Sequence, residues 1–157
     1  MSENIKIRKG TESDLQAILD LIIELAIYEK AEHEVENSIE QMKIDGFGEH
    51  PVFDFFVVEV NNKIVGTAIY YFRYSTWKGK ALYLEDLVVS ENFRGKGYGK
   101  ALLDAIVVQA KTDNCKQVRW QVLDWNEPAI AFYKSIGADL DGEWVNCTLN
   151  AQQIDNY

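Results

Sequence analysis

The spacing of apolar residues changes along the chain between the periods of helices and strands. Thr11 can cap a first helix whose apolar side chains recur every three or four residues, and Ser38 with Gln41 resembles the capping box of a second. Runs rich in Val, Ile, Phe and Tyr follow, and the turn-forming pair Asn61-Asn62 separates the first two of these. The predicted elements are a strand at residues 5–8, helices at 12–29 and 38–45, strands at 52–60, 64–74 and 81–89, a helix carrying 101–110, a strand at 118–123, a helix at 127–136 and a strand at 144–149.

This order, βααβββαβαβ, contains no internal repeat and no linker. It is typical of an α/β (α+β) fold in which helices pack on a mixed, mostly antiparallel central sheet. We therefore expect residues 1–157 to form a single domain.

Composition narrows the range of partners. The chain has 16 Lys and Arg against 25 Asp and Glu, a formal net charge of −9, which argues against nucleic acid or an anionic membrane surface as a partner. Cys115 and Cys147 stand far apart and only two histidines are present, so we expect neither a disulfide framework nor a metal site. No apolar run of signal-peptide or membrane-spanning length occurs, and a cytoplasmic location is expected.

A glycine-rich turn, residues 94–100, lies between a predicted strand and a predicted helix. Its glycines have the spacing G-x-G-x-G, which matches neither a P-loop nor the G-x-G-x-x-G dinucleotide fingerprint. Arg94, Lys96 and Lys100 add positive charge to an otherwise acidic chain. Such a turn before a helix N-terminus predicts a site for an anion such as a phosphate group.

The spacing Arg-Gly-x-Gly-x-Gly between a strand and a helix resembles the pyrophosphate loop of the GCN5-related N-acetyltransferase (GNAT) family, which binds acetyl-coenzyme A (acetyl-CoA). Further segments are similar, in order, to the spermidine/spermine N-acetyltransferase group within that family. They are residues 46–51, 70–72, 74–79, 83–87, 125–129 and 132–134. Residues 74–79 and 122–126 look closest to the branch that acetylates thialysine, a lysine analogue. The resemblance implies the GNAT fold, acetyl-CoA as co-substrate, no metal, a small amine acceptor and a homodimer.

Acetylation of an aliphatic amine requires removal of a proton, because an ammonium group has a pKa near 10.4. The resemblance assigns this role to Glu85, whereas spacing alone does not decide between Glu85 and Asp86. Strand alternation predicts that these two side chains lie on opposite faces. The resemblance also assigns Tyr133 as the donor that protonates the leaving sulfur, although a helix aromatic beside Phe132 is equally typical of core packing.

The resemblance implies that three stretches bind acetyl-CoA. A backbone N–H in the first would stabilise the oxyanion, with pantetheine lying alongside the strand. The stretches are Leu87, Val88 and Val89; Arg94, Gly95, Lys96, Gly97, Tyr98, Gly99 and Lys100; and Asn126, Glu127, Pro128, Ala129, Tyr133 and Ile136. Asn126 could instead serve only as a helix cap.

Carboxylates beside aromatic rings suit a cationic amine. The positions that the resemblance assigns to the acceptor are Tyr28, Glu29, Trp77, Glu85, Arg119, Trp120 and Gln121. Ser75 stands where polyamine acetyltransferases carry an acidic residue, which favours a thialysine-like or lysine-like acceptor over spermidine or spermine. Polyamine acetylation and a non-catalytic acyl-CoA-binding sensor are the two alternatives.

Overall fold

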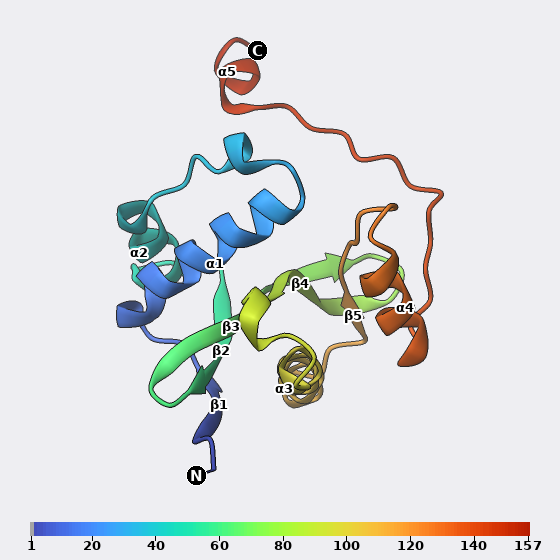
Figure 1. The fold of residues 1–157 in the computed structure, drawn as a ribbon. Coiled ribbons are helices and arrows are strands. Elements are labelled where there is room, and N and C mark those ends of the chain that lie inside the picture. The colour runs from blue at the N-terminus through green and yellow to red at the C-terminus, as the bar shows by residue number, and fades with distance from the viewer. Residues whose placement is uncertain (1) are drawn as a thin grey trace. The chain divides into compact units, whose positions relative to one another are not determined.

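A five-stranded sheet in the order β1-β2-β3-β4-β5 forms the centre of the larger part of this computed structural model, which describes residues 2–157 (Figure 1). The first four strands pair antiparallel, and β5 joins β4 in parallel. The strands are β1 Ile5–Lys9, β2 Asp54–Val60, β3 Lys63–Ser75, β4 Gly79–Val89 and β5 Gln117–Arg119. The mixed, mostly antiparallel sheet predicted from the apolar pattern is thus confirmed.

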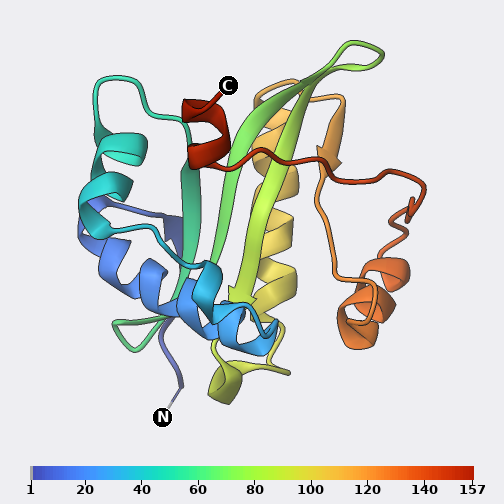
Figure 2. The same ribbon diagram turned by 90° about the horizontal axis from the view of Figure 1, so that it is seen from above.

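Helices cover both faces of this sheet (Figure 2). Helices α1, Leu15–Tyr28, and α2, Ile39–Phe47, pack on one face, and α3, Tyr98–Thr112, packs on the other. Between the sheet and the first two helices lies a buried apolar cluster, which consists of Leu15, Ile18, Met42, Phe55, Val57 and Ile69.

Two local predictions from the sequence are confirmed at atomic level. The Ser38 side chain accepts a hydrogen bond from the backbone N–H of Gln41 at 3.1 Å, which caps α2. Asn61 and Asn62 adopt φ angles of 50° and 66°, the left-handed conformation that a two-residue hairpin turn requires.

The chain divides into two compact units, residues 1–121 and 122–157. The second contains α4, Glu127–Ser135, and α5, Ala151–Asp155. The Asn126 side chain caps α4 by accepting a hydrogen bond from the N–H of Ala129 at 3.4 Å. That residues 1–157 act as one domain stays a prediction.

The last predicted strand, residues 144–149, is wrong, and a coil that leads into α5 takes its place. A strand needs a neighbour to satisfy its backbone groups, and none of the strands described for residues 2–157 pairs with this segment. Its apolar side chains consequently stay exposed, Trp144 by 74% and Val145 by 85%. Strand β5 is likewise shorter than predicted, because β4 pairs with it only along Ala81–Tyr83.

Candidate active site

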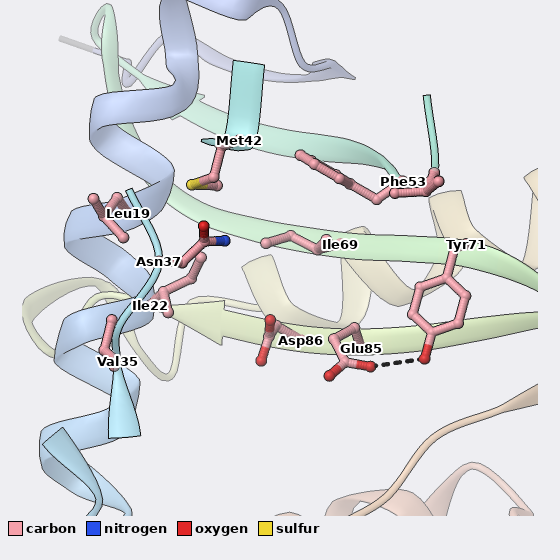
Figure 3. A pocket seen from close by; sticks show the side chains of 11 residues that line it. Leu19, Ile22, Val35, Asn37, Met42, Phe53, Ile69, Tyr71, Glu85 and Asp86 are labelled. Atoms are coloured by element: carbon pink, nitrogen blue, oxygen red, sulfur yellow. Dashed lines mark hydrogen bonds between the residues drawn. The ribbon is translucent and has the colours of Figure 1, made fainter. Parts of the chain in front are cut away.

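A β-bulge interrupts β4 at its acidic pair. Pairing with β3 aligns Ile69 with Asp86 and Tyr70 with Leu84, which leaves Glu85 without a partner of its own. An extra residue in one strand locally cancels the alternation of side chains between the two faces. Glu85 and Asp86 therefore point to the same side of the sheet (Figure 3). The expectation that they lie on opposite faces is wrong.

Both carboxylates line one cavity of about 480 Å³ on the face covered by α1 and α2. Most of the remaining wall is apolar. It is formed by Leu19, Ile22, Val35, Asn37, Met42, Val52, Phe53, Ile69 and Tyr71. The cavity thus combines negative charge on β4 with a surface suited to a carbon chain.

The two carboxylates have different surroundings. The Tyr71 hydroxyl donates a hydrogen bond to Glu85 Oε2 at 3.0 Å (Figure 3). Burial, followed by the charge of Glu85, raises the pKa of Tyr71 to about 12, so this hydroxyl remains a donor at neutral pH. Glu85 is exposed, whereas Asp86 is only partly exposed, and no donor within residues 2–157 bonds to the Asp86 carboxylate.

Burial is also the main influence on Asp86. Loss of hydration, followed by the charges of Glu85 and Glu29, raises the pKa of Asp86 from 3.8 to about 6. Glu29 directly follows α1, and its own pKa is raised by burial. The negative charges of Glu85 and Glu29 therefore act on Asp86, and a cation in the cavity would relieve this repulsion.

One edge of β4 is open beside this cavity. Its ladder with β5 ends at Tyr83, whereas its pairing with β3 continues to Val89. Beyond Tyr83, no strand in the described part of the chain pairs with the β5 side of β4. This edge, which includes Leu87, Val88 and Val89, offers backbone groups to an extended ligand.

The glycine-rich turn connects β4 to α3. Gly95 and Gly97 have φ angles of 75° and 83°, and Gly97 is the N-cap of α3. A Cβ at either glycine would meet no atom within 4 Å, so the loop backbone is open on that side. Because the first N–H groups of a helix lack helical partners, the turn fits a pyrophosphate.

Arg94 links this turn to the end of α1. Its Nε donates a hydrogen bond to the carbonyl of Val89 at 3.0 Å. Its guanidinium carbon lies 5.4 Å from the centre of the Tyr28 ring, a cation–π contact. Arg94 and Tyr28, predicted to serve the cofactor and the acceptor respectively, thus meet directly.

The other two basic residues of the turn have acidic partners. Lys96 Nζ lies 3.3 Å from Glu3 Oε1, and Lys100 pairs with Asp104 one helical turn later. Such exposed ion pairs contribute at most about 1 kcal/mol, so a phosphate could displace them. Tyr98 is different, because its ring is buried and its hydroxyl bonds to Glu3, which leaves mainly its backbone N–H for a ligand.

Several residues predicted to contact the acceptor lie away from the cavity. Trp77 occupies the turn between β3 and β4 and is 86% exposed. Ser75, at the start of that turn, is six positions after Ile69 along β3, a distance of about 20 Å. Of the residues predicted for the acceptor, Glu85 lines the cavity, and the charge of Glu29 acts on Asp86. The cavity lining does not include Tyr28, Trp77, Arg119, Trp120 or Gln121.

The remaining predicted residues belong to the second unit. Tyr133 lies on α4, where its ring packs beside Phe132 with 5.5 Å between ring centres. The residues of this unit that the resemblance assigns to acetyl-CoA are Asn126, Glu127, Pro128, Ala129, Tyr133 and Ile136. Their role in acetyl-CoA binding stays a prediction.

The sequence did not identify the apolar wall of the cavity. Leu19 and Ile22 belong to the apolar stripe of α1, which looks the same whether it covers a core or a cavity. Tyr71 stood in a predicted strand and in the resembling segment 70–72, but neither gave it a role of its own. Its role depends on the bulge that brings Glu85 to the same face.

Two further observations concern metals and membranes. Among residues 2–157, no three His, Cys, Asp or Glu side chains are grouped so as to hold a metal ion. None of the helices within those residues combines the length and apolarity needed to cross a bilayer.

Comparison with known proteins gives concordant results. A thialysine N-epsilon-acetyltransferase of Bos taurus is 42% identical over 142 residues, which cover 85% of this chain and 84% of the relative. An integron cassette protein from the mobile metagenome of V. cholerae superposes with a TM-score of 0.78 at 26% identity, over 97% of this chain and 96% of the other.

An aminoglycoside N-acetyltransferase in complex with CoA shares the fold with a TM-score of 0.73 at 16% identity, over 96% of this chain and 97% of the other. The model of the acetyltransferase (GNAT) family matches residues 15–138, most of the sheet and helices described above. The expected fold is therefore confirmed, and the chain belongs to the acetyltransferase (GNAT) family.

Proposed function

We propose that this acetyltransferase transfers an acetyl group from acetyl-CoA directly to the primary amine of a small cationic acceptor. The observation that carries the proposal is the cavity in which Glu85 and Asp86 lie together on β4. The same strand continues into the open edge at residues 87–89 and then into the glycine-rich turn. One strand would therefore hold the amine at one point and the thioester at the next.

The lining of the cavity supports an amine with a short carbon chain. The carboxylates attract an ammonium group, and the apolar wall suits methylene groups or a thioether. Ser75 occupies the position at which a polyamine acetyltransferase is expected to carry an acidic residue. The bovine relative is named a thialysine N-epsilon-acetyltransferase. Thialysine or a similar lysine-like amino acid is therefore the preferred acceptor, ahead of spermidine.

The binding of acetyl-CoA would use the glycine-rich turn and the open edge of β4. The N–H groups at the start of α3 and the charges of Arg94, Lys96 and Lys100 suit the pyrophosphate. The β4 edge suits the pantetheine chain, and an N–H among residues 87–89 would stabilise the developing oxyanion. The family resemblance also assigns residues 126–129 to acetyl-CoA binding.

Acetyl-CoA supplies the activated acetyl group as a thioester. A carboxylate of the cavity removes a proton from the ammonium, and the resemblance assigns Glu85 to this step. The freed amine attacks the thioester carbonyl and forms the new C–N bond. As the C–S bond then breaks, Tyr133 gives its hydroxyl proton to the leaving thiolate, and the second proton lost from nitrogen restores the Tyr133 hydroxyl. No covalent intermediate on a cysteine is required. We further propose a homodimer, which the family resemblance supports. A cytoplasmic location is proposed as well, and the two free cysteines support it.

Thiol release with an amine panel, combined with mass spectrometry of the acetylated product, tests the proposed function. Thialysine, lysine, spermidine and spermine would be compared at the same acetyl-CoA concentration. We expect one acetyl group on a primary amine and a higher kcat/KM for thialysine than for spermidine. Tight CoA binding without any acetylated amine would instead favour a sensor, and a preference for spermidine would favour the polyamine alternative.

A further inference from the structure

A row of side chains continues beyond the cavity along the same face of the sheet. The bulge adds its extra residue to β4, so the side chains of β3 still alternate between the two faces. Beyond Ile69 of the cavity wall, this face of β3 therefore carries Tyr71, Arg73 and Ser75. On β4, Tyr83 is the register partner of Tyr71, and the centres of the two rings lie 5.3 Å apart. The row thus leads from the cavity toward the tip of the β3–β4 hairpin.

Two arginines stand beside Tyr83 in this row. The guanidinium carbon of Arg73 lies 5.2 Å from the centre of the Tyr83 ring, a cation–π contact. Arg119 is the register partner of Tyr83 on β5, so the two side chains share a face. Burial, followed by the charge of Glu85, raises the pKa of Tyr83. The charges of Arg73 and Arg119 act on Tyr83 in the opposite direction, which agrees with their position beside it.

Neither guanidinium group has an acidic partner. Among residues 2–157, no carboxylate forms a salt bridge with Arg73 or Arg119, although the chain has a formal net charge of −9. Both side chains are exposed. Arginine presents its N–H donors in a planar fork that matches the two oxygens of a carboxylate. The two arginines are therefore available to an acidic group that a ligand supplies.

The spacing between the acidic pair and these arginines matches the length of a lysine-like amino acid. Tyr83 lies two positions before Glu85 on β4, about 7 Å along the strand. In extended lysine or thialysine, six bonds separate the side-chain nitrogen from the carboxylate carbon, about 7–8 Å. The Tyr71 side chain, bonded to Glu85 at 3.0 Å, lies between the two ends (Figure 3). An amine held at Glu85 and Asp86 would thus place the acceptor's carboxylate beside the arginines.

We propose that Arg73 and Arg119 bind the carboxylate of the acceptor while Glu85 and Asp86 hold its reactive amine. The inference rests on the proposed function and narrows the substrate class to amino acids that carry a side-chain amine and a free carboxylate. The family resemblance assigns Arg119 to the acceptor but gives Arg73 no role.

The same arginines would act against other amines. A diamine or polyamine carries a second ammonium group, which the two positive charges would repel. Ser75, on the same face of β3 as Arg73, stands where polyamine acetyltransferases carry an acidic residue. This face is therefore positive at the place where a polyamine would need negative charge.

Steady-state kinetics with thialysine and with decarboxylated thialysine, a thioether diamine, test the inference in the full-length protein. The wild type should have a kcat/KM about 10-fold or more higher for thialysine, because only this acceptor has a carboxylate for the charged donors. Arg73→Gln should raise KM for thialysine about 10-fold and leave kcat within about threefold, because it removes binding rather than chemistry. The same variant should increase kcat/KM for the diamine, since one repulsive charge is gone. A general disturbance of the fold would not move the two acceptors in opposite directions.

Two further variants serve as controls. Arg73→Lys keeps the charge without the planar fork and should recover part of the affinity for thialysine. Lys80→Gln removes an exposed cation whose Nζ lies 4.1 Å from the centre of the Phe72 ring, on the opposite face of β3 from Arg73. It should leave the preference between the two acceptors unchanged. Unaltered melting profiles would show that the variants are folded, and the wild-type comparison needs no variant.

The outcomes separate this inference from the proposed function. If the wild type acetylates both acceptors equally well, or if Arg73→Gln leaves the ratio of their kcat/KM values unchanged, the carboxylate site is refuted and the proposed acetyl transfer stands. A wild-type chain that acetylates no amine refutes the proposed function, and the inference with it.

Discussion

Replacing Asp86 by asparagine should stabilise the protein at neutral pH, although it alters a residue of the cavity. The raised pKa means that the folded state holds the Asp86 proton more tightly than the unfolded state does. The contribution of Asp86 to the free energy of unfolding is therefore complete below the unfolded pKa near 3.8 and declines as the pH rises through about 6. Asparagine resembles the protonated form, so Asp86→Asn avoids this loss.

The magnitude follows from the two pKa values. The difference between 3.8 and about 6, at about 1.4 kcal/mol per pKa unit, corresponds to about 3 kcal/mol. Water entering the open cavity screens part of this energy, so we expect a gain of about 1–3 kcal/mol above pH 7. For a chain of 157 residues, that gain equals an increase in melting temperature of about 3–9 °C.

Urea unfolding without ligand, at several pH values between 4 and 8, measures this difference. The free energies of unfolding of wild type and Asp86→Asn should be similar near pH 4 and should diverge up to about pH 6. Asp139→Asn, the same change at an exposed site, controls for net charge. A difference that is constant with pH, or a variant less stable than the wild type at pH 8, would refute the electrostatic reasoning.

Four further variants test the catalytic and binding assignments. Tyr133→Phe should slow single-turnover acetyl transfer while calorimetry shows acetyl-CoA binding largely unchanged; an unaltered rate would remove Tyr133 from the mechanism. Cys115→Ala and Cys147→Ala should keep kcat within about twofold, because direct transfer needs no thiol and burial raises the pKa of Cys115. Complete loss of activity in either variant would indicate a covalent intermediate on a cysteine. Gly97→Ala should lower the free energy of unfolding by about 1–2 kcal/mol and weaken acetyl-CoA binding, because the Gly97 φ of 83° is strained for alanine. Gly142→Ala is the control, because Gly142 lies in open space and has no such φ. Equal melting temperatures of the Gly97→Ala and Gly142→Ala variants would contradict the prediction.

Local sequence signals predicted the elements of the sheet unit well. The Ser38 cap and the Asn61-Asn62 turn depend on neighbours within a few residues, so the sequence displays them directly. The glycine spacing likewise predicted a strand-to-helix turn, and the structure has this turn between β4 and α3, with positive φ angles at Gly95 and Gly97.

Features that depend on distant pairing could not be predicted in this way. The bulge at Glu85 arises from the register between β3 and β4, and strict alternation therefore placed Asp86 on the wrong face. The apolar residues 144–149 have strand propensity but no partner strand among the described residues. Trp77 lies at the tip of a long hairpin, and hairpin length, rather than residue type, separates it from the cavity.

A crystal structure of the protein with CoA and thialysine tests the central claim most directly. The account predicts that the thialysine side-chain nitrogen lies within hydrogen-bonding distance of Glu85 and Asp86, with the CoA sulfur beside residues 87–89 and the Tyr133 hydroxyl. A thialysine nitrogen bound outside the cavity, or a CoA sulfur remote from the β4 edge, would contradict it.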